Sequence, residues 1–231
     1  HDFDNVLWNQ IVFDFICFLG GYRHFKMSFS QSGEDIILLK YLNHKKIEKG
    51  KYLDIGAFHP RWVSNTHLLH KIGFSGYCVD LDEDRLKWFR FARGKKVKTI
   101  NGAISNSYSK SIKVYKFKRK SPFSLIDTTS SDHAKYFKSK SNIDYEEIHI
   151  NNFHINDIFT KVGKINVLNI DIEGQDFEVI KSSNLKIIDP EVILIEDNSG
   201  YFPSEEFINF FSENHYSFIA TCGLTKIFGK K

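Results

Sequence analysis

The sequence predicts an α/β fold, in which helices cover both faces of a mostly parallel sheet and a hairpin forms one antiparallel edge. Two observations lead to this prediction. Short apolar runs alternate with helical segments along most of the chain, which is typical of a parallel sheet. Towards the C-terminus the order changes to a strand, a helix and two closely spaced strands, which indicates antiparallel strands at an edge.

The length of the chain bounds the number of domains. With 231 residues, of which 42% are hydrophobic, the chain can form one domain with its own core and a small appendage. We expect the domain at residues 29–231 and a helical extension at residues 1–28. The apolar part of that extension is short and contains Asn9 and Asp14, so no transmembrane segment is predicted. The three cysteines form no CxxC pair, which favours a cytoplasmic protein.

The first half of the domain is expected to contain three strands, each preceded or followed by a helix. Ser30 or Ser32 is a suitable N-cap for the first helix, because acids and then an apolar stripe follow it. The other elements are expected in this order: a strand at 52–55, a helix at 65–72, a strand ending at Asp80, a helix at 83–92 and a strand ending near Asn101.

An insertion interrupts this alternation in the second half. It covers residues from about 108 to 145, begins with an alternating segment typical of an antiparallel strand, and continues as a polar loop with one short helix. A polar segment of this length is suited to a lid over a substrate. Two apolar strands follow, ending at Asp171 and Glu196, before the terminal helix and hairpin.

Four of the five predicted parallel strands end in a carboxylate, and these residues are Asp54, Asp80, Asp171 and Glu196. Ligands of open parallel sheets bind outside the carboxyl ends of the strands. Carboxylates gathered at that edge repel one another, so they favour a ligand with cationic or hydroxyl groups. The turn after the first strand contains a single glycine and no GxGxxG phosphate cradle. S-adenosylmethionine, with a sulfonium, an amino group and a ribose diol but no phosphate, meets these requirements.

The same reasoning assigns parts of this cofactor to residues. Gly56 and Ala57 allow the backbone to approach the ligand closely. Asp80, followed by Leu81, lies at the end of the second strand and is placed to bind both ribose hydroxyls. Ala103 and Ile104, which follow the third strand, are expected to flank the adenine.

Five blocks of the sequence, in this order and spacing, closely resemble the FkbM-type methyltransferases: "SQSGEDIILL", "YLDIGAFHPRWVSNT", "GYCVDLDED", "NGAIS" and "LNIDIEGQDFEVI". The resemblance runs from about Phe29 to the C-terminus. It implies a Rossmann-like sheet of seven strands, S-adenosylmethionine as cofactor, and O-methylation of sugars or other small hydroxylated metabolites. The chain departs from many members at residues 59–62, a loop that could shape a sugar pocket.

The resemblance also implies roles for particular residues. Gln31 and Ser32 match a segment that closes over the methionine end of the cofactor. Asp54, Gly56 and Ala57 match the first motif. The motif continues through Ser64, Asn65 and Thr66.

Methylation of a sugar hydroxyl needs a base, or a metal that lowers the pKa of the hydroxyl. Asp171, which we also expect to contact the cofactor, and Glu173 are the candidate bases, with His59 as a further candidate. Carboxylate and amide oxygens after two neighbouring strands also suit Mg²⁺ or Mn²⁺. The candidate metal ligands are Asp171, Glu196, Asp197 and Asn198.

Three other functions stay open at this point. The basic segment at residues 110–120 leaves room for an RNA 2′-O-methyltransferase, although a net charge of +4 is mild for a nucleic-acid-binding protein. The same segment could instead bind the diphosphate of a nucleotide-linked sugar, the acceptor we favour. A cofactor-binding protein without catalysis and an NAD-type oxidoreductase are the remaining alternatives, and the missing glycine-rich turn argues against the latter. A homodimer is compatible with the sequence.

Overall fold

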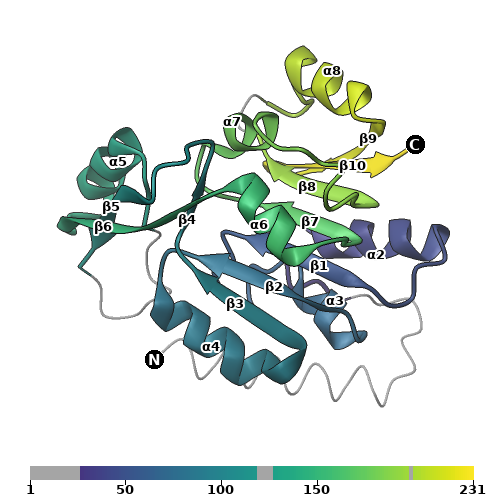
Figure 1. The fold of residues 1–231 in the computed structure, drawn as a ribbon, viewed down its shortest axis with the longest axis horizontal. Coiled ribbons are helices and arrows are strands. Elements are labelled where there is room, and N and C mark those ends of the chain that lie inside the picture. The colour runs from purple at the N-terminus through teal and green to yellow at the C-terminus, as the bar shows by residue number, and fades with distance from the viewer. Residues whose placement is uncertain (1–26, 119–126, 198–199) are drawn as a thin grey trace.

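The computed structural model describes residues 27–118, 127–197 and 200–231, and it contains a central sheet of seven strands (Figure 1). The predicted extension at residues 1–28 lies almost entirely outside this range. The strand order is β3-β2-β1-β7-β8-β10-β9. The strands are β1 (Lys51–Ile55), β2 (Ser75–Asp80), β3 (Val97–Asn101), β7 (Val167–Ile170), β8 (Val192–Glu196), β9 (Tyr216–Cys222) and β10 (Thr225–Lys230).

The first five of these strands are parallel, and the order of the sheet reverses between β1 and β7. Residue Leu53 of β1 is paired with Tyr77 of β2 on one side and with Leu168 of β7 on the other. Such a reversal is the switch point at which open α/β sheets bind their ligands. The predicted hairpin is confirmed, because β10 runs antiparallel to both β8 and β9.

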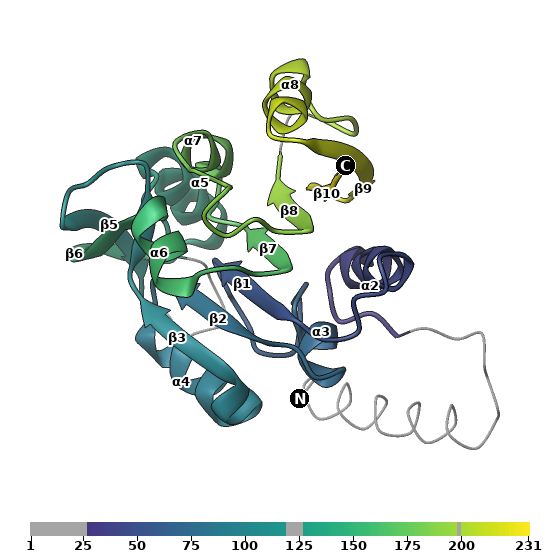
Figure 2. The same cartoon turned by 45° about the vertical axis from the view of Figure 1, so that its right-hand side comes forward.

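Helices cover both faces of the sheet, as the sequence predicts (Figures 1 and 2). One face packs against α2 (Glu34–His44), α3 (His67–Lys71) and α4 (Glu83–Arg93), through a core that includes Leu38, Leu69 and Phe89. The other face packs against α6 (Ile155–Val162), α7 (Asp176–Lys181) and α8 (Glu205–Glu213). Apolar side chains on both faces of β1, β7 and β8 explain why these strands are almost continuously hydrophobic in the sequence.

The predicted insertion and the segments that flank it, residues 103–107 and 146–154, form a second, small sheet beside the central one (Figure 2). Its strand order is β4-β6-β5, and its elements are β4 (Ala103–Ser105), β5 (Ser111–Phe117), α5 (Ser131–Ser141) and β6 (Tyr145–His154). The predicted antiparallel strand is therefore present as β5, which pairs with β6 over seven residues. A buried aromatic cluster of β5, α5 and β6 holds this unit together.

The start of α2 differs from the prediction. The N-cap position is Gly33, with φ at 90°, although the side chain of Ser30 accepts a hydrogen bond from the first-turn N–H of Asp35 at 3.3 Å. The two acids of the first turn bind the preceding loop. Asp35 accepts a hydrogen bond from the backbone N–H of Phe29 at 2.7 Å, and Glu34 accepts one from that of Ser32 at 2.7 Å. These bonds fold residues 28–33 back over the helix start.

None of the helices in the described ranges is both long and apolar enough to cross a bilayer.

Candidate active site

Two adjoining hollows lie at the carboxyl ends of β1, β2 and β7. We call them the first hollow, of about 630 Å³, and the second hollow, of about 840 Å³, both partly open to solvent. They share four lining residues, which are Gly56, Phe58, Asp171 and Glu173. Together they form one cleft at the switch point of the sheet, where a ligand is expected in this type of fold.

The first hollow combines apolar walls with two buried acids, Asp80 and Asp127. Ile55, Val79 and Ile104 supply apolar surface, and the insertion adds residues 127–129 to the lining. Asp80 accepts a hydrogen bond from the backbone N–H of Asp82 at 2.7 Å and lies 3.5 Å from the guanidinium of Arg85.

Burial raises the pKa of Asp80 to about 7, because it outweighs the opposing effect of Arg85. Arg85 is itself buried, and its guanidinium lies 4.8 Å from the ring centroid of Phe58. The acid at the end of β2 is thus held by a cation from the helix that follows it.

Asp54 lies at the edge of the second hollow and is held by two neutral side chains. Thr66 donates a hydrogen bond to one of its oxygens at 2.5 Å, and Asn169 donates to the other at 2.9 Å. Asn65 in turn donates to Asn169 at 2.9 Å. Burial raises the pKa of Asp54, whereas nearby Arg93 and these hydrogen bonds favour its charged form.

A group of three carboxylates lies beside the second hollow. One oxygen from each of Asp171, Asp176 and Glu196 lies within 4.8 Å of the other two. Asp176 accepts hydrogen bonds from the backbone N–H groups of Ile172 and Gly174, at 2.8 and 3.0 Å. Asp176 therefore holds the loop after β7, and Asp171 and Glu196 are the two acids that line the cleft.

Asp171 and Glu196 influence each other's protonation. Desolvation by the surrounding cleft raises the pKa of Asp171 above its usual value, although the residue keeps contact with solvent, and the charge of Glu196 raises the pKa further. Burial likewise raises the pKa of Glu196, to about 7. A hydrogen bond between the two carboxyl groups favours the protonated form of Asp171 and the charged form of Glu196. Because both pKa values are raised, the pair keeps protons at a higher pH than two ordinary carboxyl groups would.

The backbone around this pair has an unusual conformation. Gly56 has φ at 81°, and a Cβ atom at that position would overlap the carbonyl oxygen of Asp171, so only glycine fits there. Glu173, which lines both hollows, has φ at 62°, which is uncommon for a residue with a side chain. Burial raises the pKa of Glu173, and His133 of the insertion opposes that effect.

His59 lies in the loop after β1 and lines the second hollow. Its Nδ1 accepts hydrogen bonds from the backbone N–H groups of Arg61 and Trp62, at 3.0 and 2.8 Å. Burial, with Arg93 and Arg61, lowers the pKa of His59 to about 4. At neutral pH the ring is uncharged, carries its proton on Nε2 and cannot accept another at Nδ1 without breaking these bonds. This geometry does not suit the role of base that the sequence suggested for His59.

The structure brings most of the predicted site residues together in the cleft. The first hollow is lined by Asp80, Leu81, Ala103 and Ile104, and the second by Gln31, Asp54, Ala57, His59, Ser64, Asn65 and Glu196. Thr66 is fully buried behind the loop, and Ser32 packs against the hairpin turn at Gly223 rather than lining either hollow.

The predicted set of metal ligands is only partly assembled. Asp171 and Glu196 lie together, but Asp197 is buried outside the lining of both hollows, and Asn198 lies outside the described residues. Asp176, which the sequence analysis did not select, takes the third place in the cluster. The sequence did offer one signal for Asp176, because it lies in "DIEGQD", five residues after Asp171.

Other lining residues were also missed. Phe58 lies between the two hollows, and Leu224 of the hairpin turn reaches the second one. Leu224 is far from the motifs in sequence, so only the pairing of β10 with β8 brings it to the cleft.

An open sheet of this strand order, with a buried acid after its second strand and a single glycine after its first, is that of an α/β methyltransferase. The methyltransferase FkbM domain matches residues 54–222 of this sequence. The chain therefore belongs to the FkbM methyltransferase family, and it is an enzyme that depends on S-adenosylmethionine.

Solved structures with a similar arrangement are distant in sequence. A TehB-like S-adenosylmethionine-dependent methyltransferase from Corynebacterium glutamicum shares 11% identity, covering 87% of this chain and 88% of its own, with a TM-score of 0.42. A putative RNA methyltransferase from Pyrococcus horikoshii shares 10%, covering 90% and 91%, with a TM-score of 0.42. TehB from Haemophilus influenzae shares 12%, covering 94% and 66%, with a TM-score of 0.39. No curated protein sequence matches the chain.

Proposed function

We propose that this methyltransferase methylates a hydroxyl group of a sugar, and that Asp171 and Glu196 together accept the proton of that hydroxyl. The observation that carries the proposal is the pair of coupled carboxyl groups beside the second hollow. The pair adjoins the loop after β1, which belongs to the cofactor motif.

The residues of the cleft fit S-adenosylmethionine. The apolar walls of the first hollow suit an adenine ring, and Asp80 is placed to accept hydrogen bonds from ribose hydroxyls. The second hollow offers Gln31, Asp54 and Asn65 to the charged groups of the methionine end. When bound, the cofactor supplies an electrophilic methyl group on a sulfonium. No phosphate-binding turn is needed, which agrees with the single glycine after β1.

The acid pair supplies the base that a sugar hydroxyl needs in order to react. Such a hydroxyl is a weak nucleophile near neutral pH, and a base positioned beside it raises its reactivity. Glu196 is the charged member of the pair, and its pKa of about 7 lies near the operating pH, where a general base is most effective. Asp171 donates a hydrogen bond to Glu196 and holds the charge on that side chain.

The surroundings of the pair support an acceptor rich in hydroxyl groups. The imidazole of His59 and the carboxyl group of Glu173 line the same hollow and offer a hydrogen-bond donor and an acceptor. Val63 and Leu224 add half-exposed apolar surface that suits the carbon face of a sugar ring. A nucleotide-linked or polysaccharide-precursor sugar is the acceptor class we favour.

A divalent ion is the second candidate for activating the hydroxyl, because three carboxylates gather beside the cleft. Both oxygens of Asp176 accept hydrogen bonds from backbone N–H groups, which leaves each oxygen with a lone pair that an ion could use. Mg²⁺ or Mn²⁺ binding stays a prediction that chelation tests.

The proposed function is tested by following transfer of a labelled methyl group from S-adenosylmethionine to a panel of acceptors. The panel contains nucleotide-linked sugars, free sugars, glycan fragments and short RNA strands. We expect label on a sugar hydroxyl, located by mass spectrometry of the product. Label only on RNA would replace the sugar proposal with the RNA alternative.

A further inference from the structure

Arg93 is the last residue of α4, and it is buried behind the loop that follows β1. Only 3% of its surface is exposed, although it carries a charge that usually lies in water. It lines neither hollow. Its guanidinium donates hydrogen bonds to four oxygen atoms, each at 2.9 Å: the carbonyl of Pro60, the hydroxyls of Tyr52 and Ser64, and Oγ1 of Thr66.

We propose that Arg93 is a positioning residue for the cofactor, because it fixes the loop at residues 57–66 against β1 and so sets the shape of the second hollow. Three of these oxygen atoms, from Pro60, Ser64 and Thr66, belong to that loop, and the fourth, from Tyr52, belongs to the strand below it. This inference concerns the cofactor site of the methyltransferase and does not depend on the proposed sugar acceptor.

The hydrogen bonds of Arg93 extend to the residues that face the ligand. Thr66 accepts a bond from Arg93 and donates one to Asp54 at 2.5 Å. Asn169 donates to the other oxygen of Asp54 and accepts from Asn65. One connected network of buried polar groups therefore runs from the end of α4 to Asp54 and Asn65 in the lining of the second hollow.

The loop needs such an anchor because it has little structure of its own. Between Gly56 and the start of α3 the chain forms turns and bends but no helix or strand. Val63 has φ at 50°, a conformation that is a genuine outlier for a β-branched residue and persists only where the surroundings impose it. Arg93 binds the loop on both sides of Val63, at Pro60 and at Ser64.

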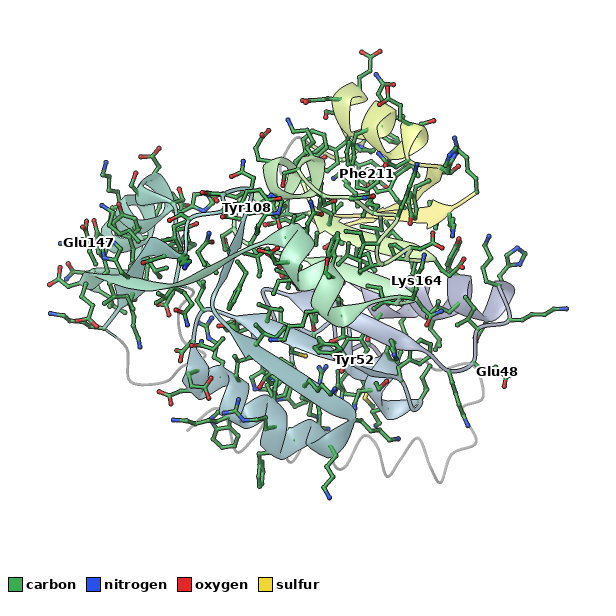
Figure 3. The ribbon with its side chains drawn as sticks, in the orientation of Figure 1. Glu48, Tyr52, Tyr108, Glu147, Lys164 and Phe211 are labelled. Carbon is green, nitrogen blue, oxygen red and sulfur yellow. The ribbon has the colours of Figure 1, made fainter. Side chains whose placement is uncertain are left out.

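An arginine suits this position better than a lysine. The guanidinium is planar and has five N–H donors in a fixed arrangement, so it can bind strand and loop at the same time. It also lies 4.8 Å from the ring centroid of Phe89 and 5.9 Å from that of Tyr52. Figure 3 labels Tyr52, which belongs to the core on the face of the sheet that α4 covers. A lysine would keep the charge but lose most of these bonds.

The test measures binding of S-adenosylhomocysteine, the unreactive product form of the cofactor, by isothermal titration calorimetry. The variants are Arg93→Lys, Arg93→Met and the milder Tyr52→Phe, which removes one partner from the strand side. The titration stoichiometry gives the folded fraction, and circular dichroism gives Tm. We expect Kd to rise at least tenfold in Arg93→Met, less in Arg93→Lys and about two- to fivefold in Tyr52→Phe, in keeping with the loss of one hydrogen bond.

The matched control is Arg90→Met, on the same helix. Arg90 also makes two side-chain hydrogen bonds, to Thr99 and Glu83, but it lies on the surface away from the loop. Its Kd should equal that of the wild type. A purely structural role would lower Tm in the Arg93 and Tyr52 variants and leave the Kd of the folded fraction within twofold of the wild type. That result would overturn the proposal.

Discussion

Asp80 and Asp171 occupy equivalent places in the sheet, because each lies where a parallel strand ends, yet their neighbours differ in charge. Asp80 lies beside the guanidinium of Arg85, whereas Asp171 lies beside the carboxyl group of Glu196. Desolvation raises the pKa of both acids. At Asp80 the charge of Arg85 opposes this rise more strongly than either Asp82 or Asp127 adds to it, whereas at Asp171 the neighbouring acids only add to the rise.

The difference shows how one edge of a sheet provides two kinds of chemistry. An acid with a cation beside it can accept hydrogen bonds from neutral hydroxyls while staying fixed in place. An acid with another acid beside it shares a proton, so the pair can take up or release one near neutral pH. The first arrangement suits binding of a ribose, and the second suits proton transfer from an acceptor.

Glu196→Gln should have the largest effect on the chemical step. The substitution keeps the size of the side chain but removes the charged member of the acid pair. We expect kcat to fall by about 100- to 10,000-fold, the usual contribution of a general base. The rate of methyl transfer in a single turnover, with the best acceptor of the panel, measures the loss.

The binding of cofactor by this variant provides the control. The affinity of Glu196→Gln for S-adenosylhomocysteine should stay close to that of the wild type. A variant with undiminished kcat would remove the acid pair from the reaction.

Asp80→Asn should have the next largest effect, and on binding rather than on chemistry. At a pH well above 7, where Asp80 is charged, a hydrogen bond to this acceptor contributes about 1.5–3 kcal/mol, so loss of the charge should raise the Kd for S-adenosylhomocysteine by roughly 10- to 100-fold. Calorimetric titration measures the change. Asp84→Asn on the exposed side of α4 is the matched control. The carboxylate of Asp84 binds the surface side chain of Lys87, and its backbone N–H donates to the side chain of Asp82 at the start of the helix. Equal affinities of the two variants would contradict the role of Asp80.

Chelation should have the smallest effect. If the acid pair acts as a base, dialysis against EDTA followed by assay with and without Mg²⁺ or Mn²⁺ should change kcat by less than about twofold. The initial rates of the dialysed enzyme with and without added ion are compared at saturating cofactor and acceptor. Loss of turnover that Mg²⁺ or Mn²⁺ restores would instead assign Asp171 and Glu196 to a metal site.

Much of the cleft could be predicted from the sequence, because the carboxyl ends of parallel strands always meet at the same edge of a sheet. Asp54, Asp80 and Asp171 each follow an apolar run, so the alternation of strands and helices was enough to gather them. The glycine after β1 was predicted to allow close approach of the ligand, whereas the structure places the carbonyl of Asp171 against it, where no other residue fits.

The remaining parts of the candidate site depend on features that no local sequence pattern encodes. Asp176 approaches Asp171 through a turn in which Glu173 adopts a left-handed conformation. Arg93 has the sequence context of an ordinary basic residue in the last turn of a helix, and only the packing of α4 on the sheet buries it. The role of His59 as a base was not supported because two backbone N–H groups from its own loop occupy its Nδ1.

The pH dependence of methyl transfer tests the shared proton of Asp171 and Glu196 most directly. Because the pKa of Glu196 is raised to about 7, the pair carries two protons below that pH and cannot accept another. The account predicts that kcat of the wild type rises with pH up to about 7 and then levels off, and that Glu196→Gln loses this rise together with its rate. A flat profile from acidic to mildly basic pH in the wild type, or the same rise in the variant, would contradict it.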